Sequence, residues 1–386
     1  MATDERTAPP SRGPPSSLIY PLLRESPLFL VTDQPMDSGI GTYAQTLFRL
    51  LSPVLPKTTI VSLGYLAQDT SEGVWTPEGI RRSGTGWIAP VYRAWNNHVL
   101  KSIIPRTSLV HFCGVDYGPT SHFERPIATV HDHYLRLPAP GSLRTPRVVG
   151  RDIASIVDYL TLPRHILQCK AVIVPTNHVR DALLKHASVR STVIHHWIDK
   201  ARFMPRPKRD SRRILGLPER GVLLLNVSAG TSNKNFSLLE RLVRILPSGY
   251  LFVKVGSPLK VESDRVRNIP RLDAQAYPLL FNACDVYVHA STEEGFGRPL
   301  LESMGSLLPV VSLRTDVSVE VLGGAGIMVP RRATQQDLLL AVRSLEDGGV
   351  AEEVAEQIKQ RCLAFSEESA RKAYVALYSR AFEEQS

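Results

Sequence analysis

Two glutamates and two glycines stand close together in a pattern that could bind a ligand. Glu294 and Glu302 are eight positions apart. Gly295, Gly297 and Pro299 lie between them, in that order. A proline fits the first turn of a helix, where its missing N–H costs little. The first N–H groups of a helix have no partner inside it, and with the helix dipole they can hold a phosphate. The glycines let a ligand approach the backbone. Because carboxylates accept hydrogen bonds from vicinal hydroxyls, the pattern indicates a nucleotide-sugar site.

The elements around this loop follow from apolar runs and chain breakers. Residues 281–288 read as a buried strand that leads into the loop, and Leu300, Leu301 and Met304 give the next helix an apolar face. After this helix we expect a strand over residues 308–313, a glycine turn over 323–326 and a short strand over 327–330.

The Glu-x7-Glu spacing within EGFGRPLLE closely resembles the signature of family 4 retaining glycosyltransferases of the GT-B fold. The following PVV at residues 309–311 and EVLGGAGIMVP at residues 320–330 are also similar to that family. A plain α/β unit with two solvated glutamates would explain a glutamate on a helix, but not Glu-Gly-Phe-Gly before a helix that starts at a proline. The chain departs from the family at residues 305–308, where the usual glycine before the proline is replaced.

A second glycine loop lies near the start of the chain. Gly39-Ile40-Gly41 follows an apolar run over residues 27–32 and precedes a helical pattern over residues 44–51. On its own this GxG indicates a tight turn as readily as a ligand loop. The resemblance implies that Gly41 belongs to the family's first glycine loop, which faces the donor phosphates, although Ser38-Gly39 replaces the family's usual Gly-Gly.

Lys234 follows an apolar run over residues 221–229, and a helical pattern over residues 236–246 comes after it. A lysine in a loop before a helix can meet a diphosphate as a point charge. The segment from Gly230 to Asn235 is similar to the family's GxxxKN. The basic residue that often accompanies this lysine is absent, so phosphate binding would depend more on Lys234 and on backbone N–H groups.

His131 stands at the carboxyl end of the run over residues 126–130, where ligands bind in α/β sheets. By itself it would be a surface loop histidine. The TVHD segment over residues 129–132 resembles the family, which implies that His131 reaches the transferred sugar. A further departure follows the first domain, where His196-Trp197 replaces the family's Asn-Gly.

Composition limits the remaining functions. The chain has 386 residues, is 43% hydrophobic and contains four scattered cysteines, which favours two or three globular domains with reduced thiols. There is no Asp-x-Asp, and neither a metal nor a cofactor is expected. No apolar run approaches the ~20 residues of a membrane helix. The Pro/Ser-rich start lacks an apolar core, so we expect a disordered tail and not a signal peptide.

The positive charge is uneven. Residues 1–205 carry 22 lysines and arginines against 15 acids, whereas residues 206–386 carry 24 against 22. A basic first half suits an anionic membrane surface or a lipid-linked phosphate, and an ordinary solvated surface is equally consistent with it. Residues 88–104 could form an interfacial helix, although an ordinary domain helix is favoured. A nucleic-acid partner is not expected, because no basic stripe rich in aromatics occurs.

Strands and helices alternate along the chain, which predicts an α/β fold with doubly wound parallel sheets. We expect further strands over residues 57–64, 108–113, 171–176, 250–255 and 268–272. We expect further helices over residues 152–169, from Asn177 onward and over residues 352–386. The resemblance implies a GT-B architecture, with two Rossmann-like domains facing a cleft and a C-terminal helix that crosses back to the first domain. The expected divisions are a disordered tail (1–22), an acceptor-side domain (23–205), a nucleotide-sugar-binding domain (206–364) and the returning helix (365–386), with a linker over residues 202–213.

The resemblance implies a metal-independent retaining hexosyltransferase. The cysteine pattern favours a cytoplasmic protein, and the basic first half suits a peripheral location on the inner face of the membrane. The enzyme would move a mannose- or glucose-type hexose from a UDP-, GDP- or ADP-sugar to a glycan or lipid-linked acceptor in polysaccharide biosynthesis. A non-catalytic, sugar-nucleotide-binding GT-B partner subunit is the alternative, and an epimerase or phosphorylase of this fold is a weaker one. The implied catalytic residues are His131 and Glu294. The implied donor-binding residues are Gly41, Gly230, Lys234, Glu294, Gly295, Phe296, Gly297, Arg298, Pro299, Leu300 and Glu302.

Overall fold

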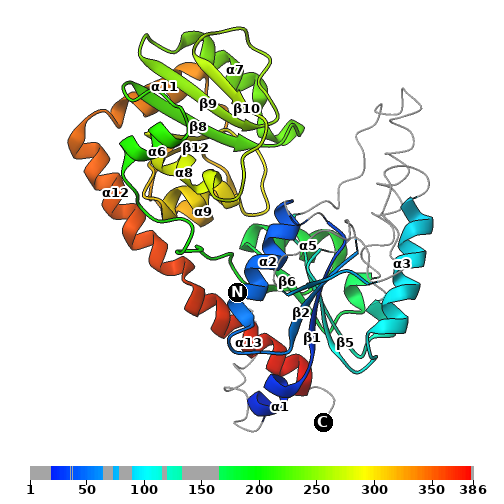
Figure 1. Ribbon diagram of the computed structural model, residues 1–386. Coiled ribbons are helices and arrows are strands. Elements are labelled where there is room, and N and C mark those ends of the chain that lie inside the picture. Colours follow the sequence, from blue (N-terminus) through cyan, green and yellow to red (C-terminus); the bar gives the residue numbers. More distant parts are fainter. Residues whose placement is uncertain are drawn as a thin grey trace, which may run out of the picture. The chain divides into compact units, whose positions relative to one another are not determined.

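The structure is a computed structural model that describes residues 19–34, 36, 38–63, 73–77, 89–114, 120–132 and 165–383 (Figure 1). It contains two parallel β-sheets. The first has seven strands in the order β3-β2-β1-β4-β5-β6-β7, and the second has six in the order β10-β9-β8-β11-β12-β13. The predicted α/β class with two Rossmann-like sheets is therefore confirmed.

The strands of the first sheet are short, and its inner strands are largely buried. They are β1 (Leu28–Thr32), β2 (Thr58–Ser62), β3 (Val74–Trp75), β4 (Leu109–Phe112), β5 (Arg125–Thr129), β6 (Ala171–Val174) and β7 (Thr192–Val193). Helices α1 (Ile19–Glu25), α2 (Gly39–Leu51), α3 (Ala89–Ile103) and α5 (Asn177–Ala187) and the 3-10 turn η1 (Thr120–His122) accompany them. α2 begins where Ser38 caps it, with the Ser38 hydroxyl accepting from Gly41 N at 3.0 Å.

The second sheet is covered on both faces by helices. Its strands are β8 (Val222–Ser228), β9 (Tyr250–Gly256), β10 (Val266–Ile269), β11 (Val286–His289), β12 (Val310–Leu313) and β13 (Ile327–Val329). Figure 1 shows α7 (Phe236–Ile245) and α11 (Gln335–Ser344) on one face, and α8 (Ala276–Ala283) and α9 (Arg298–Gly305) on the other. Because both faces are covered, β8 reads as an almost unbroken apolar run.

The remaining helices are α6 (Lys208–Ile214), η2 (Ser232–Lys234), α10 (Asp316–Leu322), α12 (Gly348–Cys362), η3 (Leu363–Phe365) and α13 (Glu367–Glu383). By their contacts, the described residues fall into two compact units. The first lies within Met1–Ala128, Arg164–Ala171 and Arg371–Ser386, and the second lies within Thr129–Pro163 and Val172–Ala370. The second unit thus contains β6, α5 and β7 together with the whole second sheet.

Several predicted boundaries are wrong. Phe281 to Ala283 end helix α8, and the strand begins only at Val286, because a short apolar run does not distinguish a buried helix end from a strand. β10 begins at Val266 and ends at Ile269, not at residue 272. Residues 19–22, which we placed in a disordered tail, belong to α1. Most of the helix predicted over residues 152–169 lies outside the described residues, as do the tail's first 18 residues.

The expected linker over residues 202–213 is also partly wrong, because α6 starts within it at Lys208. The buried Arg212 side chain explains why this charged segment is ordered. Its guanidinium donates to the carbonyl oxygen of Ala283 at 2.8 Å and pairs with Asp285 at 2.6 Å. An arginine-rich sequence therefore packs as part of the second unit through a buried, fully engaged guanidinium.

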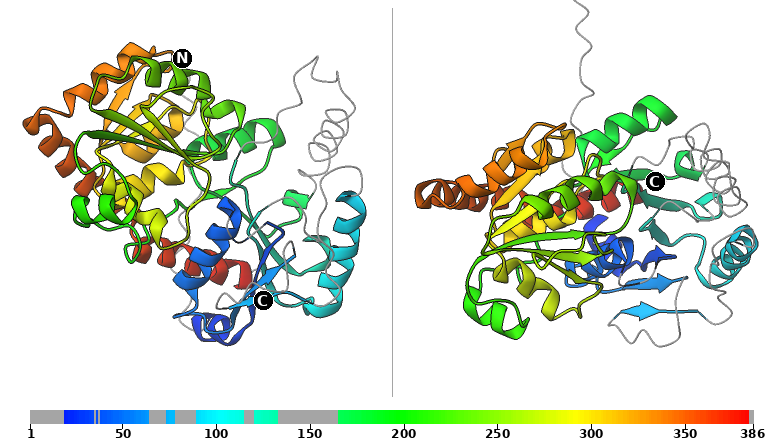
Figure 2. Two further views of the ribbon diagram at one scale, coloured as in Figure 1. Left: turned by 45° about the horizontal axis from the view of Figure 1, so that its top comes forward. Right: turned by 90° about the horizontal axis from the view of Figure 1, so that it is seen from above.

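The predicted C-terminal helix is present as α13, and its later part packs in the first unit. In Figures 1 and 2 this red segment runs beside the blue α2. The hydroxyls of Tyr374 and Tyr43 lie 2.8 Å apart, and the Tyr378 hydroxyl lies 2.7 Å from Nδ1 of His111. All four side chains are buried, so these hydrogen bonds connect α13 to α2 and β4 without competing water.

Replacing Tyr374 by phenylalanine should lower the free energy of unfolding by about 1–2 kcal/mol, because the buried Tyr43 hydroxyl loses a partner. In the Tyr43→Phe/Tyr374→Phe double variant the loss should be smaller than the sum of the single losses. Urea denaturation measures both, and Tyr20→Phe on the exposed side of α1 is the matched control. Equal stability of Tyr374→Phe and the wild type would contradict the role of this hydrogen bond.

Candidate functional site

The glycine loop joins β11 to α9 as its sequence pattern predicts. Gly297 stands at the N-cap of α9 with φ +80°, in the left-handed region that favours glycine. Pro299 lies in the first turn, and the Leu300 side chain is fully buried beneath the loop. The start of α9 therefore lies directly at the loop, where the positive end of the helix dipole favours a phosphate. Within this turn Pro299 has no N–H, and Leu300 N donates to Gly297 O at 2.8 Å.

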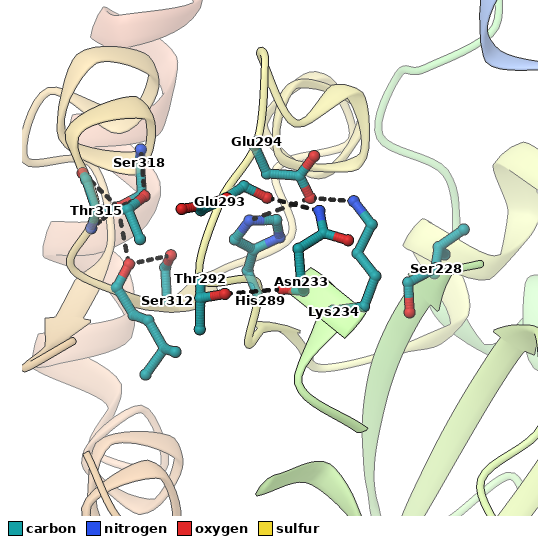
Figure 3. A network of polar contacts seen from close by, with 12 residues as sticks. Ser228, Asn233, Lys234, His289, Thr292, Glu293, Glu294, Ser312, Thr315 and Ser318 are labelled. Carbon is teal, nitrogen blue, oxygen red and sulfur yellow. Dashed lines mark hydrogen bonds and ion pairs between the residues drawn. The ribbon is translucent and has the colours of Figure 1, made fainter. Parts of the chain in front are cut away.

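Lys234 and Glu294 meet at this loop (Figure 3). The ammonium of Lys234, at the end of η2, lies 2.5 Å from Oε1 of Glu294, and the two side chains are 18% and 14% exposed. Backbone and amide groups fix the two loops to each other: Thr292 N donates to Asn233 O at 2.8 Å, and Asn233 Nδ2 donates to Glu293 O at 2.8 Å. The structure thus brings together two residues that are 60 positions apart and were both predicted as site residues.

His289 lies directly behind Glu294 and was not predicted. Its Nε2 atom is 3.9 Å from Glu294 Oε1, and the side chain is buried (Figure 3). Burial lowers the pKa of His289 to about 4, with a smaller lowering from Lys234, while Glu294 raises it. His289 therefore stays neutral at physiological pH. The only sequence signal was a histidine at the last position of a buried strand beside the glycine loop.

Glu302 has a partner that sequence reasoning also missed. The Tyr277 hydroxyl, from α8, donates to Glu302 Oε2 at 2.7 Å. Arg298, one turn earlier on α9, lies 3.8 Å from Glu302 Oε1. Burial raises the pKa of Tyr277 well above its usual value, so Tyr277 remains a hydrogen-bond donor. Glu302 is thus held in one orientation, with its oxygens directed by two neighbours.

His131 belongs to the same compact unit as the glycine loop and packs against it through the backbone. A Cβ atom on Gly295 would overlap the carbonyl oxygen of His131 and a carboxylate oxygen of Asp132, and would lie 2.8 Å from the His131 carbonyl carbon. On the other side, the Thr176 hydroxyl donates to Gly295 O at 2.9 Å. Gly295 is therefore required by the close approach of two chain segments, a reason for glycine that its sequence pattern did not reveal.

The other predicted donor-binding residues differ in what they can offer. Phe296 is buried with its ring against His196 and Phe365, so its side chain anchors the loop and only its backbone can contribute. Gly230 sits in the loop after β8, where an added Cβ would lie 3.0 Å from Ser257 Oγ. Gly41 lies in α2, which belongs to the first unit.

Part of the chain resembles a known family of glycosyltransferases. Residues 226–347 match the family model described as "Glycosyl transferases group 1", and this range contains Lys234, Glu294 and Glu302. A D-inositol 3-phosphate glycosyltransferase from Salinispora arenicola is 27% identical over 212 residues, which is 46% of each chain. The chain therefore spans about half the length of the curated relative that it matches.

Solved structures show the same fold over almost the whole chain. Sucrose-phosphate synthase from Thermosynechococcus elongatus gives a TM-score of 0.68 at 16% identity, covering 93% of this chain and 99% of its own. WaaG, a glycosyltransferase involved in lipopolysaccharide biosynthesis, gives 0.69 at 16% identity, covering 90% and 98%. Anabaena Alr3699/HepE in complex with UDP and glucose gives 0.69 at 15% identity, covering 92% and 100%. The predicted GT-B fold is thus confirmed.

Membrane-spanning helices and clusters of metal ligands are absent from the described residues. In that part of the chain, no helix combines the length and the apolar character needed to cross a bilayer. Within the same residues, no three histidine, cysteine, aspartate or glutamate side chains gather in a way that could hold a metal ion.

Replacing Gly295 by alanine should destabilise the protein by about 1–3 kcal/mol, because the new methyl group meets backbone atoms that cannot move independently. Thermal or urea denaturation measures the loss. Gly348→Ala is the matched control: nothing lies within 4 Å of a Cβ at that helical position, so this change should be neutral or slightly stabilising. Equal stability of the two variants would contradict the close approach at Gly295.

The low pKa of His289 predicts a pH-dependent part of the stability. The unfolded chain, with a histidine pKa of about 6.5, binds more protons than the folded protein between pH 6.5 and 4. Stability is therefore lost as pH falls through this range, by up to about 3 kcal/mol from this residue.

His289→Phe removes this titration. In urea denaturation, the fall in unfolding free energy between pH 7 and pH 4.5 should be smaller in the variant than in the wild type. Comparing each protein with itself at the two pH values separates titration from any packing loss at pH 7. If the variant lost as much stability as the wild type, His289 would not be the buried neutral group described here.

Proposed function

We propose that this protein is a metal-independent retaining glycosyltransferase. It moves a mannose- or glucose-type hexose from a UDP-, GDP- or ADP-sugar to a glycan or lipid-linked acceptor. The observation that carries the proposal is the meeting of Lys234 and Glu294 at the start of α9, inside the segment that matches the group 1 glycosyltransferase model.

This pair can serve both parts of a nucleotide sugar. A lysine ammonium has three donors and a carboxylate two acceptor oxygens, so each group can bind a ligand without leaving the other. Lys234 then neutralises charge on the departing diphosphate together with the N–H groups at the start of α9, and Glu294 accepts hydrogen bonds from sugar hydroxyls. The two groups are 18% and 14% exposed, where such interactions are stronger than in water.

The remaining roles follow from the geometry and from the resemblance together. Glu302, oriented by Tyr277 and Arg298, binds the ribose hydroxyls. His131 contacts the transferred sugar, and the leaving phosphate takes the acceptor proton. Relatives support a nucleotide-sugar donor: Alr3699/HepE is described with UDP and glucose, and a trehalose-6-phosphate protein from E. coli with UDP-2-fluoro glucose.

The acceptor side and the cellular location are proposed from charge. The excess of basic residues lies in residues 1–205, and α3 in this half exposes Trp95 at 46% of its surface. An exposed amphipathic aromatic side chain in a basic half of the chain suits the interface of an anionic membrane. We therefore place the enzyme in the cytoplasm, peripheral on the inner face of the membrane, where a lipid-linked or glycan acceptor in polysaccharide biosynthesis is available.

Thermal shift against UDP, GDP and ADP, each with and without magnesium, tests the donor site. A ligand at 100 times its dissociation constant stabilises by about 2.7 kcal/mol. We expect one diphosphate to raise the melting temperature without magnesium, and Lys234→Ala to abolish the rise. Lys359→Ala, which removes an exposed lysine on α12, should leave it unchanged.

The outcomes separate the candidate functions. No shift with any diphosphate would contradict the enzyme proposal. A shift with no sugar transfer from the corresponding nucleotide sugar would favour the non-catalytic partner subunit. A shift that requires magnesium would contradict metal independence alone.

A further inference from the structure

His196 lies between His131 and Phe296 of the glycine loop and has no role in the function proposed above. Its ring stacks on that of His131, with centroids 5.5 Å apart and planes at 18°. It follows β7 in a buried segment that is fixed by a hydrogen bond from Ile198 N to Phe365 O at 3.0 Å. His196 therefore presents a ring of fixed position to the face of His131.

The other side of His196 meets the glycine loop. The Phe296 ring stands edge-on to His196 at 4.8 Å, with the planes at 77°. Phe296 is itself held edge-on against Phe365 of η3 at 5.9 Å. Edge-to-face and stacked arrangements at these distances are the favoured geometries of aromatic pairs. His131, His196 and Phe296 thus form a continuous row of rings that ends two residues after Glu294.

A backbone contact runs parallel to this row. Gly295 packs directly on the carbonyl of His131, and the Thr176 hydroxyl holds the Gly295 carbonyl from the opposite side. The backbone contact fixes the main chain of His131 relative to the loop. The orientation of its imidazole depends on side-chain contacts, and the stacked His196 ring restrains the plane of that imidazole.

The charge state of His196 suits this arrangement. Burial lowers its pKa well below the usual value, and the positive charges of His131, Arg298 and His195 lower it further. At neutral pH His196 is therefore an uncharged ring. It can pack against a second imidazole without the repulsion that two imidazolium rings would suffer.

We propose that His196 is a positioning residue that holds the His131 imidazole in a fixed orientation beside Glu294. In this orientation His131 and Glu294 can contact the same sugar. This inference rests on the proposed function, in which His131 contacts the transferred sugar. His196 itself acts only through His131. The flat face of the His196 ring provides this restraint. The phenyl ring of His196→Phe should therefore preserve it, and the methyl group of His196→Ala should not.

The placement can be tested without any ligand. In histidine-labelled protein, the His131 ring signal is identified as the one that His131→Ala removes. A stacked ring shifts this signal upfield. We expect His196→Ala to move the His131 signal downfield, because the imidazole loses its stacked neighbour and samples more orientations. His196→Phe should leave the His131 signal near its wild-type position. An unchanged His131 signal in His196→Ala would overturn the proposal.

The functional consequence is measured by calorimetry with UDP and UDP-glucose, and with the GDP and ADP pairs. The ratio of the dissociation constants of diphosphate and nucleotide sugar reports contacts to the sugar alone. His196→Ala should lower this ratio by about three- to tenfold, the worth of one hydrogen bond, as His131→Ala does, while diphosphate binding is retained. His196→Phe should keep the wild-type ratio.

The double variant His131→Ala/His196→Ala distinguishes positioning from general damage. If His196 acts through His131, the ratio of dissociation constants should be no lower in the double variant than in His131→Ala. A lower ratio in the double variant would overturn the proposal. If the wild type bound none of the diphosphates, the proposed function would fail, and the ligand-free His131 signal would still decide whether His196 orients that ring.

Discussion

The ion pair between Lys234 and Glu294 constrains the whole ligand-facing end of the second sheet. Each charge is mostly buried, and removing either partner would leave the other uncompensated at a cost of several kcal/mol. Because the two residues lie on loops after different strands, β8 and β11, the loops must stay in register for the charges to remain paired. The hydrogen bonds from Thr292 and Asn233 maintain this register. The pair therefore determines the shape of the surface as well as its charge.

Buried neutral histidines surround this charged pair. His289 lies behind Glu294, and His196 lies against Phe296 of the same loop; both have pKa values lowered by burial. Neutral rings provide polar atoms and flat faces without adding positive charge beside Lys234. Protonation of His289 in acid would add a positive charge behind Glu294.

The sequence was sufficient for features that depend on local pattern and insufficient for those that depend on distant contacts. Apolar runs identified most strands of both sheets because parallel strands are buried on both faces. The glycine loop and its helix were also found, since Gly297 and Pro299 carry conformational signals of their own. Tyr277 and His196 were missed because their partners lie far along the chain, and His289 was missed because its burial behind Glu294 depends on how the loop folds. Arg212 was misread as linker for the same reason: its burial depends on Ala283 and Asp285, more than 70 positions later.

The network of Tyr43, His111, Tyr374 and Tyr378 has a consequence for biosynthesis. The first compact unit is discontinuous, since Tyr43 and His111 find their hydrogen-bond partners more than 260 positions further along the chain. A ribosome adds residues from the N-terminus onward, so these early side chains are made long before α13 can reach them. The second unit, whose residues between 172 and 370 are continuous, can complete its core earlier. During translation Tyr43 and His111 therefore lack these hydrogen-bond partners until α13 has been made.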